Sequence, residues 1–174
     1  MNYVACIAEG AAEKAIIDIL LNHHLLIFNR EEMLDEQVLR CRSASMFESR
    51  YLRKGFSGKI TVYRILDSRR ENFRLSKAYE HKVDVINVVT APEIEMLIIL
   101  NENCYEDFKK SGMKPSEYCM TVLKLHRVKS YDFVIQYFSD PSVLIAAMKK
   151  YKEVSKIPKG EWPLFNLINR NVNR

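Results

Sequence analysis

The sequence predicts an α/β fold: a mostly parallel sheet with helices on both faces and a C-terminal helical cap. Over the first hundred residues, short apolar runs alternate with segments of helical periodicity. Such alternation is typical of parallel sheets that are covered on both faces. After Asn101 the chain carries helical patterns without clear strands between them. We therefore expect the cap to follow the sheet in the chain.

Each expected strand is a short run rich in apolar or β-branched residues. The first run ends at Gly10, and the run at residues 60–66 is rich in β-branched and aromatic side chains. A glycine-containing turn at residues 54–59 precedes that second run. The expected strands are residues 2–8, 25–28, 60–66 and 83–89.

Each expected helix is a segment whose composition or spacing favours helical periodicity. Ser45, followed by Glu48 three residues later, resembles a capping box that starts a helix. Pro92 is suited to the first turn of another helix. The expected helices are residues 11–21, 45–52, 71–82, 92–100, 115–125, 131–138 and 141–154.

The length of 174 residues is most simply one domain, with a core at 1–101, a cap at 102–154 and an irregular tail at 155–174. Three apolar side chains are expected to dock the tail: Trp162, Leu164 and Phe165. No apolar run reaches the roughly 18 residues that span a bilayer. The four cysteines are widely spaced, which argues against zinc and favours reduced thiols in a cytoplasmic protein without membrane contact.

Acidic residues stand at the points where expected strands end. Glu9 follows the first strand, with Glu13 four residues later, and Asp67 follows the strand at 60–66. Glu95 lies in the first turns of the helix after the strand at 83–89. The carboxyl ends of parallel strands form the ligand-binding edge of α/β sheets, and carboxylates there can share a hard cation such as Mg²⁺. Glu13 has the alternative role of stabilising a helix N-terminus.

Basic residues cluster beside Asp67, and the whole chain carries a net charge of +5. This cluster has two interpretations: a solvated surface, or a phosphate-binding face that gives non-specific affinity for nucleic acid. The residues expected to bind nucleic acid are Arg64, Arg69, Arg70, Arg74 and Lys77.

In their order along the chain, these motifs resemble the Toprim fold, and most closely the small RloB-like and AbiLii-type proteins of bacterial phage-defence loci. Glu9 matches the Toprim glutamate, Glu13 the second glutamate of the nuclease branch, and Asp67 the first aspartate of the Asp-x-Asp motif. Pro92, Ile94 and Glu95 match the Pro-x-Phe-Glu segment of the RloB-like proteins. The resemblance covers residues 3–101, and more loosely the helices to about residue 153.

The resemblance implies a nuclease that uses Mg²⁺ or Mn²⁺ and cleaves DNA or RNA in phage defence. Glu9, Asp67 and Glu95 would be catalytic, and these three together with Glu13 would bind metal. Two positions depart from the family pattern: Arg69 stands where the second aspartate is expected, and Leu97 stands where the family has an aromatic residue after the glutamate.

Arg69 supports an alternative, a catalytically degenerate module that binds nucleic acid or a partner ATPase. A third class, adenine methyltransferase, lacks support because the chain has neither a Gly-x-Gly cofactor turn nor an Asn/Asp-Pro-Pro-aromatic motif.

Overall fold

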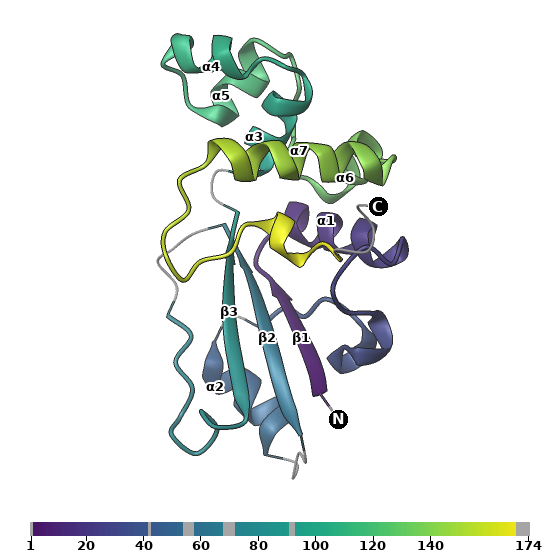
Figure 1. Ribbon diagram of the computed structural model, residues 1–174, viewed down its shortest axis with the longest axis vertical. Coiled ribbons are helices and arrows are strands. Elements are labelled where there is room, and N and C mark those ends of the chain that lie inside the picture. Colours follow the sequence, from purple (N-terminus) through teal and green to yellow (C-terminus); the bar gives the residue numbers. More distant parts are fainter. Residues whose placement is uncertain (1, 42, 54–57, 68–71, 91–92, 170–174) are drawn as a thin grey trace.

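The computed structural model describes residues 2–41, 43–53, 58–67, 72–90 and 93–169. Within them, the sheet has three parallel strands in the order β1-β2-β3 (Figure 1). These are β1 (Asn2–Ala8), β2 (Lys59–Leu66) and β3 (Val83–Val89). β2 pairs with both neighbours and is the central strand. The predicted α/β class with a parallel sheet is confirmed.

Helices and short helical turns surround the sheet. The α-helices are α1 (Ala11–Asn22), α2 (Ala44–Phe47), α3 (Glu93–Asn101), α4 (Tyr105–Ser111), α5 (Pro115–Thr121), α6 (Tyr131–Tyr137) and α7 (Pro141–Val154). The 3-10 helices are η1 (Arg30–Glu32), η2 (Leu34–Glu36) and η4 (Leu164–Leu167), and the π-helical turn η3 (Glu48–Leu52) continues α2. None of the described helices is long and apolar enough to cross a membrane.

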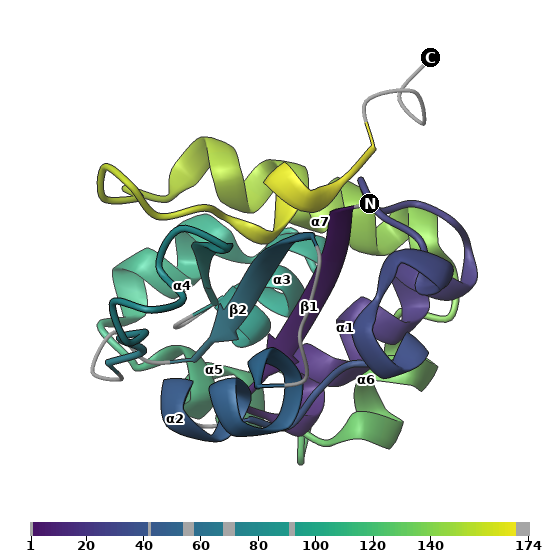
Figure 2. The same cartoon turned by 90° about the horizontal axis from the view of Figure 1, so that it is seen from below.

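The two faces of the sheet belong to two separate hydrophobic clusters, because successive side chains of a strand point to opposite faces. On β2, Tyr63 and Ile65 pack into the larger cluster with α1, α3, α6 and α7. Ile60 and Val62 pack into the smaller cluster with α2 and η3. Figure 2 shows the strands between α2 on one side and the C-terminal segment with η4 on the other.

Helices α3 to α7 lie beyond the carboxyl ends of the strands, towards which β1, β2 and β3 all run (Figure 1). Local sequence explains where the last two helices begin. The Ser130 hydroxyl accepts a hydrogen bond from the backbone N–H of Phe133 at the start of α6, and the Asp140 carboxylate accepts one from Ser142 at the start of α7. α7 packs against α3, and α6 packs against α1. The helical cap therefore lies beyond the carboxyl edge of the sheet.

The C-terminal segment docks on the sheet through backbone hydrogen bonds as well as apolar contacts. The N–H of Trp162 donates to the carbonyl of Asn87 at 2.9 Å, and the N–H of Val89 donates to the carbonyl of Trp162 at 3.0 Å. Leu164 is fully buried. This segment therefore covers the outer edge of β3 near its carboxyl end.

Three sequence expectations differ from the structure. Residues 72–82 form an extended segment and turns instead of a helix, and Phe73 and Leu75, two positions apart, both pack on the smaller cluster. Residues 25–28 form no strand and make only a single bridge, Leu26 to Ile168. The helix expected from Ser45 is capped by Ser43, whose hydroxyl accepts from the N–H of Met46 at 3.2 Å. In addition, α4 was not expected; its Tyr105 and Phe108, three positions apart, pack against the larger cluster, and the other residues of the helix are exposed.

Candidate functional site

Glu9 and Asp67 lie side by side at the carboxyl edge of the sheet. Ala8 at the end of β1 pairs with Ile65 of β2, so the residues after the two strands are neighbours. The backbone N–H of Asp67 donates a hydrogen bond to Oε2 of Glu9 at 3.2 Å. The side chain of Asp67 is exposed, and that of Glu9 is 14% exposed. The expected adjacency of these two strand ends is confirmed.

Arg64 lies beneath this pair, inside the protein. Its side chain is 3% exposed, and its guanidinium lies 3.9 Å from Oε1 of Glu9. It also donates to Oδ1 of Asn87 at 3.4 Å and stacks over the ring of Phe73 at 4.8 Å. The expectation that Arg64 forms part of a nucleic-acid surface is therefore wrong: β2 points it into the smaller cluster, where it orients Glu9 by charge.

Glu13 is buried on the first turn of α1, with 3% of its surface exposed. The single proton of the Thr90 hydroxyl is shared between two acceptors, Oε1 of Glu13 at 3.3 Å and the carbonyl of Leu66 at 2.9 Å. Burial raises the pKa of Glu13, and the negative charge of Asp67 adds to the rise. The Thr90 hydrogen bond and the positive charge of Lys129 lower the pKa again without cancelling the effect.

Gly10 makes room for the Glu13 carboxylate. A Cβ atom at position 10 would lie 2.1 Å from Oε2 of Glu13, far inside van der Waals contact. The backbone φ of Gly10 is −107°, so any residue could adopt this conformation and space alone favours glycine. The Glu-Gly-x-x-Glu motif thus places one carboxylate at the sheet edge and folds the second back over the glycine.

Glu95 lies on α3 with a different immediate partner. Its side chain is 5% exposed, and Oε1 lies 3.2 Å from the ammonium of Lys129. Glu95 and burial together raise the pKa of the Cys119 thiol to about 11, with burial the larger cause. Among the described contacts, the Glu95 carboxylate forms an ion pair with Lys129, and no contact joins it to Glu9 or Asp67.

The described residues contain no group of three or more His, Cys, Asp or Glu side chains arranged to hold a metal ion. The structure brings together Glu9 and Asp67 directly, and it couples Glu13 electrostatically to Asp67. Mg²⁺ is commonly bound in proteins by one or two carboxylates together with waters and substrate phosphates. The Glu9–Asp67 pair is consistent with that minimal donor set.

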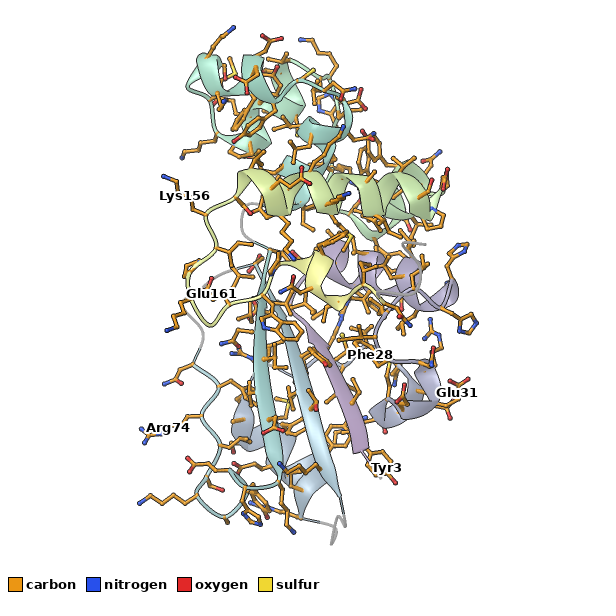
Figure 3. The ribbon with its side chains drawn as sticks, in the orientation of Figure 1. Tyr3, Phe28, Glu31, Arg74, Lys156 and Glu161 are labelled. Carbon is orange, nitrogen blue, oxygen red and sulfur yellow. The ribbon has the colours of Figure 1, made fainter. Side chains whose placement is uncertain are left out.

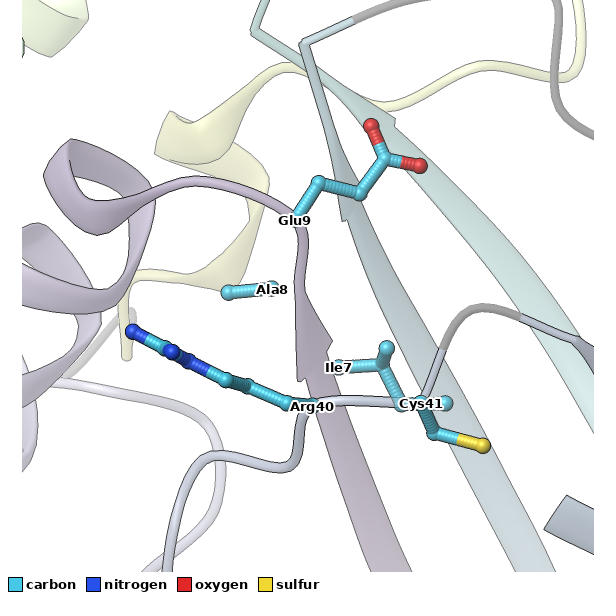
Figure 4. Close-up of a pocket in the computed structure, with 5 residues that line it drawn as sticks. All are labelled: Ile7, Ala8, Glu9, Arg40 and Cys41. Atoms are coloured by element: carbon cyan, nitrogen blue, oxygen red, sulfur yellow. The ribbon is translucent and has the colours of Figure 1, made fainter. Parts of the chain in front are cut away.

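A small pocket of about 170 Å³ opens beside Glu9. Its other lining residues are Ile7, Ala8, Arg40 and Cys41, and Figure 4 shows the side chains of Glu9 and Arg40 extending in different directions from it. Arg40 is exposed. In the sequence, Arg40 is only one member of a basic stretch. It reaches the pocket because its neighbour Leu39 forms a bridge with Ile7 of β1, and no local sequence signal predicts that bridge.

Two of the basic residues expected to bind nucleic acid lie on the extended segment 72–82, and both are exposed. Arg74 points away from the sheet into solvent (Figure 3), and Lys77 lies in the turn that follows. Arg69 and Arg70 are outside the described residues, as is Pro92. Sequence reasoning missed Lys129, which neutralises Glu95 from a loop more than thirty residues away, because only the tertiary fold joins the two.

No family model, curated protein or solved structure matches this chain significantly.

Proposed function

We propose that this chain is a divalent-metal-dependent nuclease of the Toprim type that cleaves a phosphodiester of DNA or RNA. The single observation that carries the proposal is the juxtaposition of Glu9 and Asp67 at the carboxyl ends of two adjacent parallel strands. This edge is where α/β sheets bind ligands. The setting in phage defence rests on the resemblance alone.

Glu9 and Asp67 would hold the cation, Mg²⁺ or Mn²⁺, because both carboxylates are reachable from solvent. When bound, the ion would supply a Lewis acid that activates water and offsets charge on the phosphate. Arg64 keeps Glu9 in place from below, since its guanidinium lies 3.9 Å from Oε1 while Oε2 faces the backbone of Asp67. The protein thus presents one carboxylate that is held on both sides and a second that is free to turn towards a ligand.

Glu13 would act as the proton donor in the cleavage reaction. Its raised pKa, caused mainly by burial, lets it keep a proton at higher pH than an ordinary glutamate. A carboxyl group of this kind can act as a general acid that protonates the leaving oxygen. Thr90 fixes the orientation of the carboxyl through its hydroxyl. Exposed Arg74 and Lys77 would add long-range attraction for the phosphate backbone.

The second candidate is a catalytically degenerate module that binds nucleic acid or a partner protein without cleaving. Two observations favour it: the described residues form no three-ligand metal group, and Arg69 replaces the expected second aspartate. In a module that binds without turnover, Glu9 and Asp67 would have only a structural role at the strand ends. The basic residues would then form the functional surface.

The test compares the wild-type protein with Glu9→Gln/Asp67→Asn on plasmid DNA, single-stranded DNA and tRNA, each with Mg²⁺, Mn²⁺ or EDTA. The matched control is Glu80→Gln/Asp84→Asn, which removes the same two charges from exposed positions away from the carboxyl ends of the strands. We expect metal-dependent cleavage by the wild type and the control, and none by the site variant. Equal inactivity of all three, with binding that weakens steeply as salt rises, would establish the binding module instead.

A further inference from the structure

A second cavity of about 240 Å³ lies between α3, α5 and the segment that joins α5 to α6. Glu95 contributes the buried carboxylate of this cavity. Met120, Leu125 and Val128 contribute apolar walls, and the remaining lining residues are Ser116 and three basic side chains: His126, Arg127 and Lys129. The cavity therefore combines a carboxylate acceptor, an apolar slot and a rim of basic side chains.

The acceptor is Oε2 of Glu95. This atom is buried, and no described group donates a hydrogen bond to it. Its companion Oε1 faces Lys129. A buried carboxylate oxygen without a donor is costly in a folded protein, and each such atom calls for a physical explanation. A donor brought by a bound ligand is the explanation that also accounts for the cavity.

The loop that carries the basic rim has two positive φ angles, one at Arg127 of the cavity lining and one at Lys124, just before the lining residues of that loop begin. Lys124 and Arg127 have φ angles of 58° and 55°, in the left-handed region that side chains other than glycine rarely adopt. Such residues cluster at ligand-binding sites, where the surrounding structure holds them in place. Here the two positions expose basic side chains around His126 on one short loop. The concentration of positive charge favours an anionic ligand or an anionic part of one.

We propose that this cavity binds a single unpaired nucleobase that carries an amino group, presented by a nucleic-acid strand; the proposal rests on the nucleic-acid substrate of the proposed function. An exocyclic amino group supplies the N–H donor that Glu95 lacks, as when a glutamate accepts from cytosine. Thymine and uracil instead place carbonyl oxygens beside their one N–H, and these repel a carboxylate. The apolar slot receives the face of the base, whose pairing edge must be free.

The cavity size and the charge of Lys129 agree with this ligand. A volume of about 240 Å³ is below the roughly 300–1,000 Å³ of sites for drug-sized ligands, and suits one base. The side chain of Lys129 is 54% exposed, so its ammonium can contact a backbone phosphate at the rim while it stays beside Oε1 of Glu95. The amino group of the base then donates to Oε2, the oxygen that has no described donor.

The test measures the binding of labelled thymidine heptanucleotides whose central base is A, C, G or T. It is run in EDTA, so that binding is separated from metal-dependent cleavage. We expect wild type to bind the A, C and G strands about tenfold more tightly than the all-T strand. Glu95→Gln removes the acceptor charge and should abolish this preference. Glu117→Gln, an exposed charge change on α5 outside the cavity, should retain it.

A second variant protects the test if Glu95→Gln fails to fold by circular dichroism. Ser116→Trp fills the cavity from an exposed position on α5 and should also remove the preference. Equal affinity of wild type for all four strands would overturn the base pocket and leave the nuclease proposal intact. Absence of binding to any strand would overturn both. Free nucleoside monophosphates are added as competitors of the labelled strands. If they compete as effectively as unlabelled strands do, the proposal that the base is presented by a strand is overturned.

Discussion

The backbone N–H of Asp67 donates to Oε2 of Glu9, 3.2 Å away, and joins the ends of two neighbouring parallel strands. The orientation of the Glu9 carboxylate therefore depends on the main chain of residue 67 and on Arg64, and not on the side chain of Asp67. The two carboxylates thus have different structural roles at the same edge.

Replacing the two carboxylates by alanine should have unequal effects on stability. Glu9→Ala leaves the buried Arg64 with one anion fewer and should lower the free energy of unfolding by about 1–3 kcal/mol. Asp67→Ala changes an exposed side chain and should stay within about 0.5 kcal/mol. Urea denaturation at neutral pH measures both. An equal loss for the two variants would contradict the asymmetry.

Gly10→Ala should force the Glu13 carboxylate out of its place, because the new methyl group would lie 2.1 Å from Oε2. We expect a destabilisation of about 1–3 kcal/mol. The double variant Gly10→Ala/Glu13→Ala should recover most of this loss, because the clashing atom is gone. Gly112→Ala is the control: its φ of 67° makes the substitution costly for backbone reasons, so Glu13→Ala should not rescue it. A double-mutant cycle without coupling between positions 10 and 13 would reject the account.

Glu13 should make the protein less stable as pH rises. Burial, and next the charge of Asp67, raise its folded-state pKa above the unfolded value of about 4.3. Between the two pKa values the folded state holds more protons than the unfolded state, so stability falls through this window with rising pH. Glu13→Gln should therefore be more stable than wild type at pH 7.5, with a smaller gain at pH 4. The thermal midpoints at the two pH values measure this, and a gain independent of pH would contradict it.

Arg64 and Arg74 should differ in the binding of nucleic acid. Arg64→Met removes a buried cation and should lower the thermal midpoint while leaving the salt dependence of binding unchanged. Arg74→Met and Lys77→Met change exposed side chains and should each reduce the slope of log affinity against log salt by up to about one, at unchanged stability. A reduced slope for Arg64→Met would place its side chain at the phosphate backbone after all.

The cysteines should react unequally with a thiol reagent. Burial raises the pKa of Cys6 to about 12 and that of Cys119 to about 11, and Cys41 is also buried. Cys104 alone among the four is partly exposed. Because the thiolate is the reactive form, native protein at pH 8 should titrate one fast thiol, and urea should release the other three. Loss of the fast phase in Cys104→Ser identifies it, and two or more fast thiols would contradict the burial.

Periodicity predicted the strands because their side chains are mainly apolar and, in β1 and β2, largely buried. The run at residues 60–66 is apolar except for Thr61 and Arg64, and it forms the central strand of the sheet. The segment at 71–82 was predicted as a helix because its apolar spacing also fits one. Phe73 and Leu75 instead pack against the smaller cluster in an extended conformation, and the backbone N–H of Ser76 donates to Glu48. The tertiary contact outweighed a weak local preference.

The sequence by itself determined the order of the strands along the chain and the acidic residues that follow them, because both depend on short-range patterns. It therefore placed Glu9 and Asp67 at one edge once the strands were taken as parallel neighbours. Only the tertiary structure decided which charges meet: Arg64 points inward beneath Glu9, and Lys129 neutralises Glu95 from another loop. Such pairings depend on the way side chains point in the folded protein and on contacts between segments far apart in the sequence. Local periodicity does not predict which charged side chains meet.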